Sequence, residues 1–291
     1  MGIYNLGSIN IDHFYQVPNI PKPGETLAAS AYFSGVGGKG ANQSVAAARA
    51  GSATFHIGAI GRDGLWIVER LASYGVNIEN VAVLDGATAH AIINVDPNGE
   101  NAIVIFSATN LEQDKGRIAA ALSDASASDI FILQNETSLV EYSAQYAREK
   151  GMRVVYSAAP FDAEIVRRIL PYIDILVLNE VEADQLSAAL GVEPKNLPVD
   201  AVLTTRGADG ATYQSDGAQF EVAAFSVTAI DTTGAGDTYL GYFVASLDAG
   251  MDVKNAMILA SGASAIQVTR AGTADAIPAL DEVKQFIKSH G

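Results

Sequence analysis

Residues 129–151 read DIFILQNETSLVEYSAQYAREKG, and this stretch decides the fold class. It begins with a short apolar run and continues, from Ser138, with an amphipathic run that ends at Gly151. A short apolar run followed by a run of helical period is typical of a βα unit. Ser138 and Glu141 fit a helix capping box, and Gly151 stands where a glycine closes a helix. We therefore predict a strand followed by a helix.

The same pattern recurs in both directions along the chain. The apolar runs FHIGAI (55–60) and DILVLN (174–179) precede the amphipathic runs LWIVERLASYG (65–75) and EADQLSAALG (182–191), which also end in glycine. Repeated βα units with right-handed crossovers build a mostly parallel sheet with helices on both faces. Such sheets bind ligands beyond the carboxyl ends of their strands.

Two stretches interrupt the alternation, residues 12–34 and residues 88–106. The first is rich in proline, and the second contains two alternating runs joined by the turn-forming sequence Asp96–Gly99. Both are expected to be extra strands inserted between βα units. They could pair into a small second sheet that acts as a lid over the strand ends. The pattern alone equally allows surface hairpins without a role.

Composition excludes several classes of protein. The chain has 291 residues, of which 49% are hydrophobic and 18% charged, so it is neither disordered nor collagen-like. Its 18 basic and 33 acidic residues give a net charge of −15. Nucleic acid and anionic membranes would be repelled by such a surface. An anionic ligand would have to be met locally by helix N-termini, metal ions or single lysines.

The chain contains no cysteine, which excludes disulfides, thiolate zinc sites and cysteine nucleophiles. Met1–Asn10 lacks the features of a signal peptide, and no apolar run approaches the roughly 18 residues of a membrane span. We expect a soluble, unprocessed, cytosolic chain.

The histidines and the single tryptophan indicate no site. The histidines are scattered without metal-ligand spacing, which disfavours transition-metal catalysis. Trp66 stands at a core position of the helical period, so we expect it to be structural. The histidines are His13, His56, His90 and His290.

Gly35–Gly40 satisfies the dinucleotide fingerprint G-x-G-x-x-G, but its context does not. The preceding predicted strand, Ile3–Ile11, lies too far upstream, and the nearest acidic candidate, Asp63, falls in a turn. Lys39 is followed by glycine, so this is not a Walker A loop either. What remains is a glycine cluster that opens a helix over Ala41–Ala50 and, by itself, indicates a tight turn.

Asp231–Asp237 reads DTTGAGD and precedes the apolar-periodic run Tyr239–Leu247, so its glycines open a helix. Free N–H groups there would form an anion hole for a phosphoryl group. Asp237 could then accept a hydroxyl proton, with a pKa depressed by the helix N-terminus. The alternative makes Asp237 a partner of the helix dipole and Asp231 a cap.

Two further segments follow predicted strands. Asn179–Glu182, after the strand Ile175–Leu178, suits either a magnesium ion held through water or a simple helix cap. Thr204–Gly210, after the strand Ala201–Leu203, is either a glycine-rich turn or a segment passing under a nucleotide.

Together these segments resemble the ribokinase-like family of carbohydrate kinases over nearly the whole chain. Gly37–Gln43 is similar to the N-terminal signature of that family, and Asp231–Asp237 to its C-terminal one. Gly7–Asp12 and Pro23–Thr26 are similar to its ribokinase branch. The resemblance implies one three-layer α/β/α domain over residues 1–291, with a mostly parallel central sheet and a small β-sheet lid.

The resemblance also implies roles for individual residues. The sugar would be held by Asn10, Asp12, Gly38, Lys39, Asn42, Glu136 and Asp237. ATP would lie along Asn179, Thr205, Gly207, Gly210, Gly236 and Ser261, although Ser261 replaces the usual Asn or His. The transferred phosphoryl group would meet Gly234, Ala235 and Gly236, with Asp237 as catalytic base. Glu182 would lie in the outer shell of Mg²⁺.

A monovalent cation, K⁺, is implied as well. Its ligands would be Asp231, Thr233, and the backbone carbonyl groups near Gln267, Arg270 and Gly272. Ala276 replaces a serine commonly found there, so one side-chain ligand is missing.

The implied activity is transfer of the γ-phosphoryl group of MgATP to the primary hydroxyl of a pentose, foremost ribose to ribose 5-phosphate. Two alternatives stay open: a kinase of this family for another sugar or a nucleoside, and a non-catalytic sugar- or nucleotide-binding regulator. The family also implies a homodimer formed through the lid, and we expect neither a nucleic-acid nor a membrane partner.

Overall fold

The computed structural model describes residues 1–290. Its larger sheet contains strands β1 (Ile3–Leu6), β4 (Thr54–Gly61), β5 (Val76–Asn77), β6 (Val81–Leu84), β9 (Ile130–Leu133), β10 (Arg153–Ser157), β11 (Ile175–Asn179), β12 (Ala201–Thr205), β13 (Ala211–Ser215) and β14 (Ala218–Val222). The order is β14-β13-β12-β11-β10-β9-β1-β4-β5, with β6 also paired to β4. All neighbouring strands of this sheet pair in parallel except β12 with β13 and β13 with β14, which pair antiparallel.

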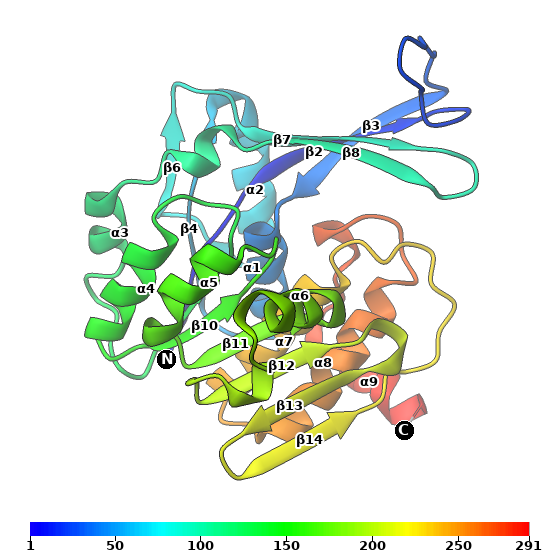
Figure 1. The fold of residues 1–291 in the computed structure, drawn as a ribbon. Coiled ribbons are helices and arrows are strands. Elements are labelled where there is room, and N and C mark those ends of the chain that lie inside the picture. The colour runs from blue at the N-terminus through cyan, green and yellow to red at the C-terminus, as the bar shows by residue number, and fades with distance from the viewer. Residues whose placement is uncertain (291) are drawn as a thin grey trace.

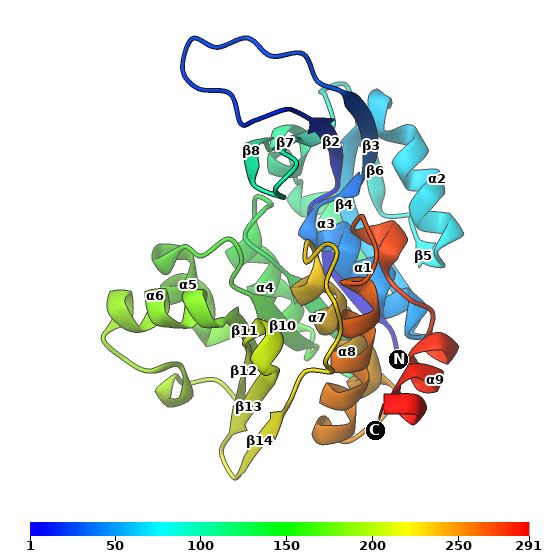
Figure 2. The same ribbon diagram turned by 90° about the vertical axis from the view of Figure 1, so that its right-hand side faces the viewer.

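Helices cover both faces of this sheet (Figures 1 and 2). One face packs against α1 (Lys39–Arg49), α2 (Leu65–Ser73), α7 (Ala235–Asp248), α8 (Val253–Gln267) and α9 (Leu280–His290). The other packs against α3 (Lys115–Ala121), α4 (Val140–Glu149), α5 (Ala163–Ile169) and α6 (Glu180–Leu190). Side chains of β9 alternate between the two cores, as the pleat requires. The predicted α/β fold is confirmed.

The strand order reverses at β1. The chain passes from β1 to β4 on one side and later from β9 to β12 on the other. The loops after β1 and β9 therefore meet: a Cβ atom built on Gly7 would lie 2.7 Å from Gln134 Oε1. Ligands of open α/β sheets bind in the crevice at such a switch point.

A second sheet projects from the edge of the body where β1 ends (Figure 1). It consists of β2 (Asn10–Gln16), β3 (Ala31–Gly37), β7 (Ala89–Val95) and β8 (Asn101–Phe106), in the order β3-β2-β7-β8. The prediction that the two insertions pair with one another is confirmed. We call this four-stranded sheet the lid sheet.

The prediction of one strand over Ile3–Ile11 is wrong. Strand β1 ends at Leu6, and β2, which begins at Asn10, belongs to the lid sheet. The bend between them packs closely on helix α1, because a Cβ atom on Gly7 would lie 2.4 Å from Gly40 Cα. The close contact between Gly7 and Gly40, which are far apart in the sequence, therefore separates β1 from β2.

Two local predictions are also corrected. Ser138 is not a helix cap: α4 starts after Leu139, which has a φ of 62°, and Ser138 Oγ accepts a hydrogen bond from Gln113 N. Trp66 is 38% exposed and does not belong to the core. The glycines predicted to close helices do adopt positive φ, namely Gly75, Gly151 and Gly191. No helix within residues 1–290 is long and apolar enough to cross a membrane.

Candidate active site

Helix α1 begins with N–H groups that the chain itself satisfies. Gly38, with a φ of 93°, precedes the helix, and a Cβ atom there would lie 2.7 Å from Ser8 O. Lys39 N donates to Glu136 Oε2 at 3.1 Å, and Gly40 N donates to Ser8 Oγ at 3.3 Å. Ser8 Oγ in turn donates to the same carboxylate oxygen of Glu136. This helix N-terminus is therefore closed by residues that follow β1 and β9.

Helix α7 begins differently. Gly234 precedes it with a φ of 77° and, being a glycine, offers no side chain to cap it. First-turn N–H groups, such as those of Gly236 and Asp237, have no acceptor within a helix. A Cβ atom on Gly236 would meet nothing within 4 Å. Asp231 accepts from Thr233 N instead of capping the helix, so the alternative that made it a cap is wrong. The N-terminus of α7 is open.

The two helices pack closely enough to share hydrogen bonds. A Cβ atom on Gly241 would lie 2.4 Å from Ala46 Cβ, so glycine is needed for this approach. Asn42 Nδ2 donates to Asp237 Oδ2 at 3.2 Å, and Gln43 Nε2 donates to Asp237 Oδ1 at 2.9 Å. The two signature segments, almost 200 residues apart in sequence, therefore meet at one carboxylate.

A buried polar chain fixes the direction of the Gln43 amide. Gln134 Nε2 donates to Gln43 Oε1 at 2.7 Å and to Asn5 Oδ1 at 2.9 Å. Because these bonds use both N–H groups of Gln134, Gln43 must turn its own amide nitrogen toward Asp237. Sequence reasoning did not assign Asn5, Gln43 or Gln134 to the site. A polar residue within a buried apolar strand, such as Asn5 in β1, was the available signal.

Burial controls the charge of Asp237. It raises the pKa of this carboxyl group, and the nearby Lys39 ammonium group and the two amide donors oppose that rise. The expected depression of its pKa by the helix N-terminus is therefore wrong, since desolvation is the larger effect. Asp237 in turn raises the pKa of Lys39, which keeps that side chain charged.

Two polar side chains of β2 lie at the base of the lid sheet. Asn10 Oδ1 accepts from Asn110 Nδ2 at 2.8 Å, and both residues are buried. Asp12 is also buried, and burial, followed by the charge of Glu136, raises its pKa to about 7. Gly37 leaves the space for this carboxylate, because a Cβ atom there would lie 2.0 Å from Asp12 Oδ2. Sequence reasoning did not assign Asn110.

A cavity of about 390 Å³ opens beside the N-terminus of α7. Its volume is in the range of small-ligand pockets. Five of the residues implied for ATP line it, namely Thr205, Gly207, Gly210, Gly236 and Ser261. The hydroxyl of Ser261 donates to Ala223 O at 3.3 Å. The cavity is also lined by the segment from Ala224 to Val227 and by Tyr239, which sequence reasoning did not assign.

Asn179 is not among the residues that line this cavity. Together with Glu182 it forms a capping box: Glu182 N donates to Asn179 Oδ1 and Asn179 N donates to Glu182 Oε2, each at 2.8 Å. Burial raises the pKa of Glu182. The helix-cap interpretation of this segment is confirmed, and any contact with phosphate or metal would be additional to it.

The residues implied for a monovalent cation also lie together. Asp231 Oδ2 accepts from Gly272 N at 3.1 Å. Gln267 Nε2 donates to Thr233 O at 2.8 Å and to Gly272 O at 3.3 Å. The guanidinium group of Arg270 faces away to Ala276 O and Glu282.

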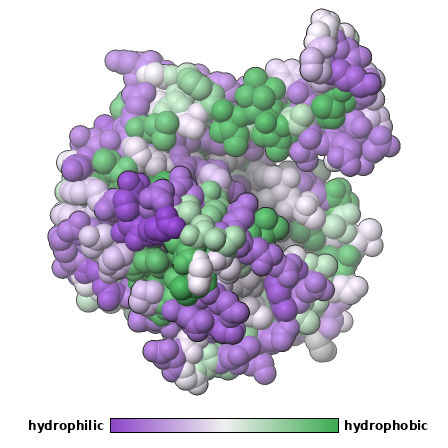
Figure 3. All heavy atoms as spheres, in the orientation of Figure 1, coloured by the Kyte–Doolittle hydropathy of each residue, from purple (hydrophilic) through white to green (hydrophobic). Residues whose placement is uncertain are grey.

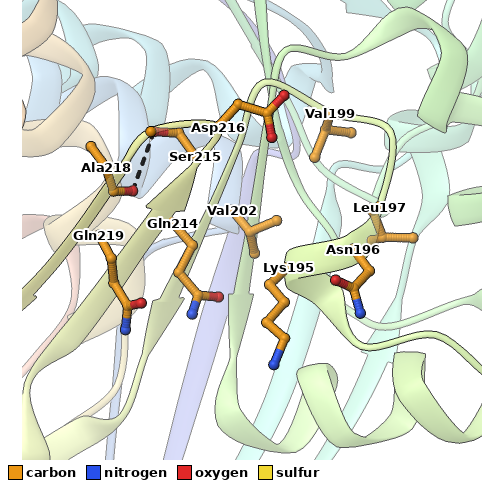
Figure 4. A pocket seen from close by; sticks show the side chains of 11 residues that line it. Lys195, Asn196, Leu197, Val199, Val202, Gln214, Ser215, Asp216, Ala218 and Gln219 are labelled. Atoms are coloured by element: carbon orange, nitrogen blue, oxygen red, sulfur yellow. Dashed lines mark hydrogen bonds between the residues drawn. The ribbon is translucent and has the colours of Figure 1, made fainter.

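A second cavity, of about 420 Å³, lies between the 195–199 segment and the β13–β14 hairpin (Figure 4). It is lined by the paired residues Val202 and Gln214, near the amino end of β12. The predicted site residues follow the carboxyl ends of the strands, so this cavity is separate from them.

Comparison with known proteins identifies the family. The model of the pfkB family of carbohydrate kinases matches residues 3–280. Ribokinase of Haemophilus influenzae is 36% identical, over 97% of each chain. The solved structure of Thermotoga maritima ribokinase superposes with a TM-score of 0.90 at 32% identity, covering 99% of each chain. Arabidopsis thaliana ribokinase, solved with ribose and ATP, gives 0.88 at 27% identity, covering 99% of this chain and 98% of its own. The chain therefore belongs to the pfkB family of carbohydrate kinases and is a phosphotransferase of the ribokinase type.

Proposed function

We propose that this enzyme transfers the γ-phosphoryl group of MgATP to the primary hydroxyl of ribose, giving ribose 5-phosphate. One observation carries the proposal: the open N-terminus of α7 adjoins the 390 Å³ cavity on one side and the Asp237 carboxylate on the other. Phosphoryl transfer is catalysed mainly by positioning and by stabilising the charge on the moving group. First-turn N–H groups supply part of that stabilisation.

Asp237 would orient the sugar hydroxyl and take its proton as the bond to phosphorus forms. The Asn42 and Gln43 amides hold both carboxylate oxygens in place. The raised pKa of Asp237 increases its basicity, which favours acceptance of this proton. The Lys39 charge opposes this rise in pKa and so favours the ionised form of the carboxylate.

ATP would occupy the cavity lined by Thr205, Gly207, Gly210 and Ser261, with its phosphates toward Gly236. Within residues 1–290, no group of three histidine, aspartate or glutamate side chains is placed to hold a metal alone. Mg²⁺ would therefore be carried mainly by the phosphates, with Glu182 in its outer shell and Asn179 nearby. The ion would neutralise charge on the β- and γ-phosphate oxygens.

Ribose would bind between the lid sheet and the switch point of the large sheet. Carboxylates and amides suit adjacent hydroxyls because each offers two bonding sites. Asn10 and Asp12 would contact the sugar from the lid sheet, and Lys39, Asn42 and Glu136 from below. The lid would also exclude water, a competing acceptor.

The experiment that tests this function is a panel of pentoses, hexoses and nucleosides assayed by coupled detection of ADP. We expect ribose to give the highest kcat/KM. A higher kcat/KM for another sugar or a nucleoside would support the first alternative, since residues around the pocket set size selectivity. Ligand binding without any phosphoryl transfer would support a regulator.

We also propose that the enzyme is a cytoplasmic homodimer formed through its lid sheets. Strand β8 lies at the edge of the lid sheet, and its residues Ile103, Val104, Ile105 and Phe106 are each at least 50% exposed. Figure 3 shows hydrophobic side chains gathered over this sheet. An exposed apolar edge strand needs a partner. Light scattering during size-exclusion chromatography should give twice the 30.3 kDa chain mass, and a monomer would contradict this proposal.

A further inference from the structure

The residues that the family resemblance assigns to K⁺ do not fit that ion. Gln267 Nε2 donates to two of the carbonyls assigned to the ion, Thr233 O at 2.8 Å and Gly272 O at 3.3 Å. Both carboxylate oxygens of Asp231 accept backbone N–H groups, from Thr233 and Gly272. Ala276 contributes no side-chain oxygen. Gln267 O accepts Arg270 N at 3.0 Å. Apart from the Arg270 carbonyl, each remaining oxygen ligand is therefore already bonded to a donor of the chain itself.

The position of the Gln267 amide is that of a bridging cation. One nitrogen lies within hydrogen-bond distance of two carbonyls from separate segments. Gln267 is fully buried, so water does not compete for these bonds. Reversing the amide would place its oxygen against two carbonyl oxygens, which fixes the nitrogen in this place. Its own Oε1 has no partner among the described residues.

We propose that the Gln267 side chain replaces the monovalent cation, so that phosphoryl transfer by this enzyme does not require K⁺. Its two N–H groups join the segment Asp231–Asp237 to the loop that contains Gly272. Thr233 directly precedes Gly234, the residue before α7, so anchoring its carbonyl holds the open helix N-terminus. Gln267 touches no reacting atom and is a positioning residue. This inference rests on the proposed kinase function.

The loop on the other side of this bridge is itself anchored. Thr273 Oγ1 donates to Val36 O at 2.6 Å, and both residues are buried. Val36 lies near the end of β3, which pairs with β2 of the lid sheet. The Gln267 amide thus links the anion hole to a loop fixed against the lid sheet. The chain supplies here the connection that an ion would supply.

The first test uses the unmodified enzyme. Phosphoryl transfer is measured with the tris salt of ATP in tetramethylammonium chloride, and again after replacement by KCl at equal ionic strength. Tetramethylammonium is too large to bind between carbonyls. We expect the two rates to agree within about twofold, because the two salts at equal ionic strength screen charges to the same extent. A rate that rises about tenfold or more with K⁺ would overturn the proposal, with the buried Oε1 then a candidate ligand.

The second test removes the bridge. In Gln267→Ala, both carbonyls lose their donor and a cavity opens between them. We expect kcat in tetramethylammonium chloride to fall about tenfold, because the anion-hole donors lose their fixed positions. KCl should restore most of that loss. Thr269→Val is the matched control: the Thr269 hydroxyl bonds only to Ile266 O, near the end of α8, so the variant should not respond to K⁺.

Direct ion binding gives a readout that does not depend on activity. Crystals soaked in thallium(I) acetate, a probe for K⁺ sites, should show no anomalous peak between Thr233 O and Gly272 O in the unmodified enzyme. Gln267→Ala crystals should show one. A peak in the unmodified enzyme would refute the replacement. Absence of phosphoryl transfer under every salt condition would instead refute the kinase function. Failure of the kinase function can therefore be distinguished from failure of the cation replacement.

Discussion

The two glycine-rich helix starts, before α1 and before α7, look alike in sequence but differ in what their N–H groups meet. At α1, Glu136 and Ser8 accept the first N–H groups. At α7, no described side chain does so. Both helices have a glycine with positive φ immediately before their first residue. A glycine cluster therefore indicates close backbone approach, and only the partners from distant strands decide whether the helix can receive an anion.

The glycines at the N-termini of α1 and α7 also have different structural roles. Gly40 is needed for packing, because a Cβ atom there would lie 2.3 Å from Gly7 Cα. Gly236 has open space around it. The first maintains the fold and the second leaves room for a ligand. Two predictions test this contrast, and a third extends it to a buried carboxylate of the lid sheet.

The largest effect is expected for Asp237→Asn, which removes the base at the open helix start. We predict a fall in kcat by a factor of about 10² to 10⁴, the usual contribution of a general base. Binding of ATP and sugar should be largely kept, as measured by isothermal titration calorimetry. Asp281→Asn, in the first turn of α9, is the control and should leave kcat unchanged. Near wild-type turnover in Asp237→Asn would remove the proposed role.

The second prediction applies one substitution to both helix starts. Gly236→Ala should leave the melting temperature unchanged, because the added methyl group meets no atom. It should lower kcat/KM for ATP by roughly 10²-fold, since it occupies the space where the phosphoryl group would lie. Gly40→Ala should instead destabilise the fold by about 1–3 kcal/mol or more, through overpacking against Gly7 and Ser8, which follow β1.

Urea unfolding and steady-state kinetics measure both sides of this pair. A folded, stable and inactive Gly40→Ala enzyme would contradict the packing role of α1. A fully active Gly236→Ala enzyme would show that phosphate does not approach the N-terminus of α7.

The smallest effect concerns Asp12, whose pKa is raised by burial to about 7 in the folded chain, from 3.8. Between these values the folded state binds more protons than the unfolded one, so stability falls as pH rises through about 7. Asp12→Asn should flatten this part of the pH profile of the melting temperature and also raise KM for ribose. Glu100→Gln, at the exposed turn of the lid sheet, should change neither. An unaltered profile in Asp12→Asn would assign the slope to other groups.

Much of the fold follows from periodicity along the chain. Runs such as 129–134 and 174–179 carry the signal of buried parallel strands, and both became strands of the large sheet. The lid strands were also predictable, since alternation is a local property. The break at Gly7 was not, because it depends on contact with Gly40, which is distant in sequence.

The site was predictable to the extent that it lies within signature segments. Asp237 and Asn42 belong to such segments, and the structure joins them by a hydrogen bond. Asn5, Gln134 and Asn110 lie outside them and act through partners that no local pattern reveals. The pKa of Asp237 could not be derived locally either, because it reflects desolvation by several elements.

By itself, the sequence determined the layered α/β fold, the presence of two strand-forming insertions and the glycine-rich start of α7, because each follows from the spacing of neighbouring residues. The tertiary structure alone decided which helix start stays open, which carboxylate is buried, and which donor meets Thr233 O and Gly272 O. Those properties depend on hydrogen bonding and desolvation between segments far apart in the chain, and such contacts exist only once the chain has folded.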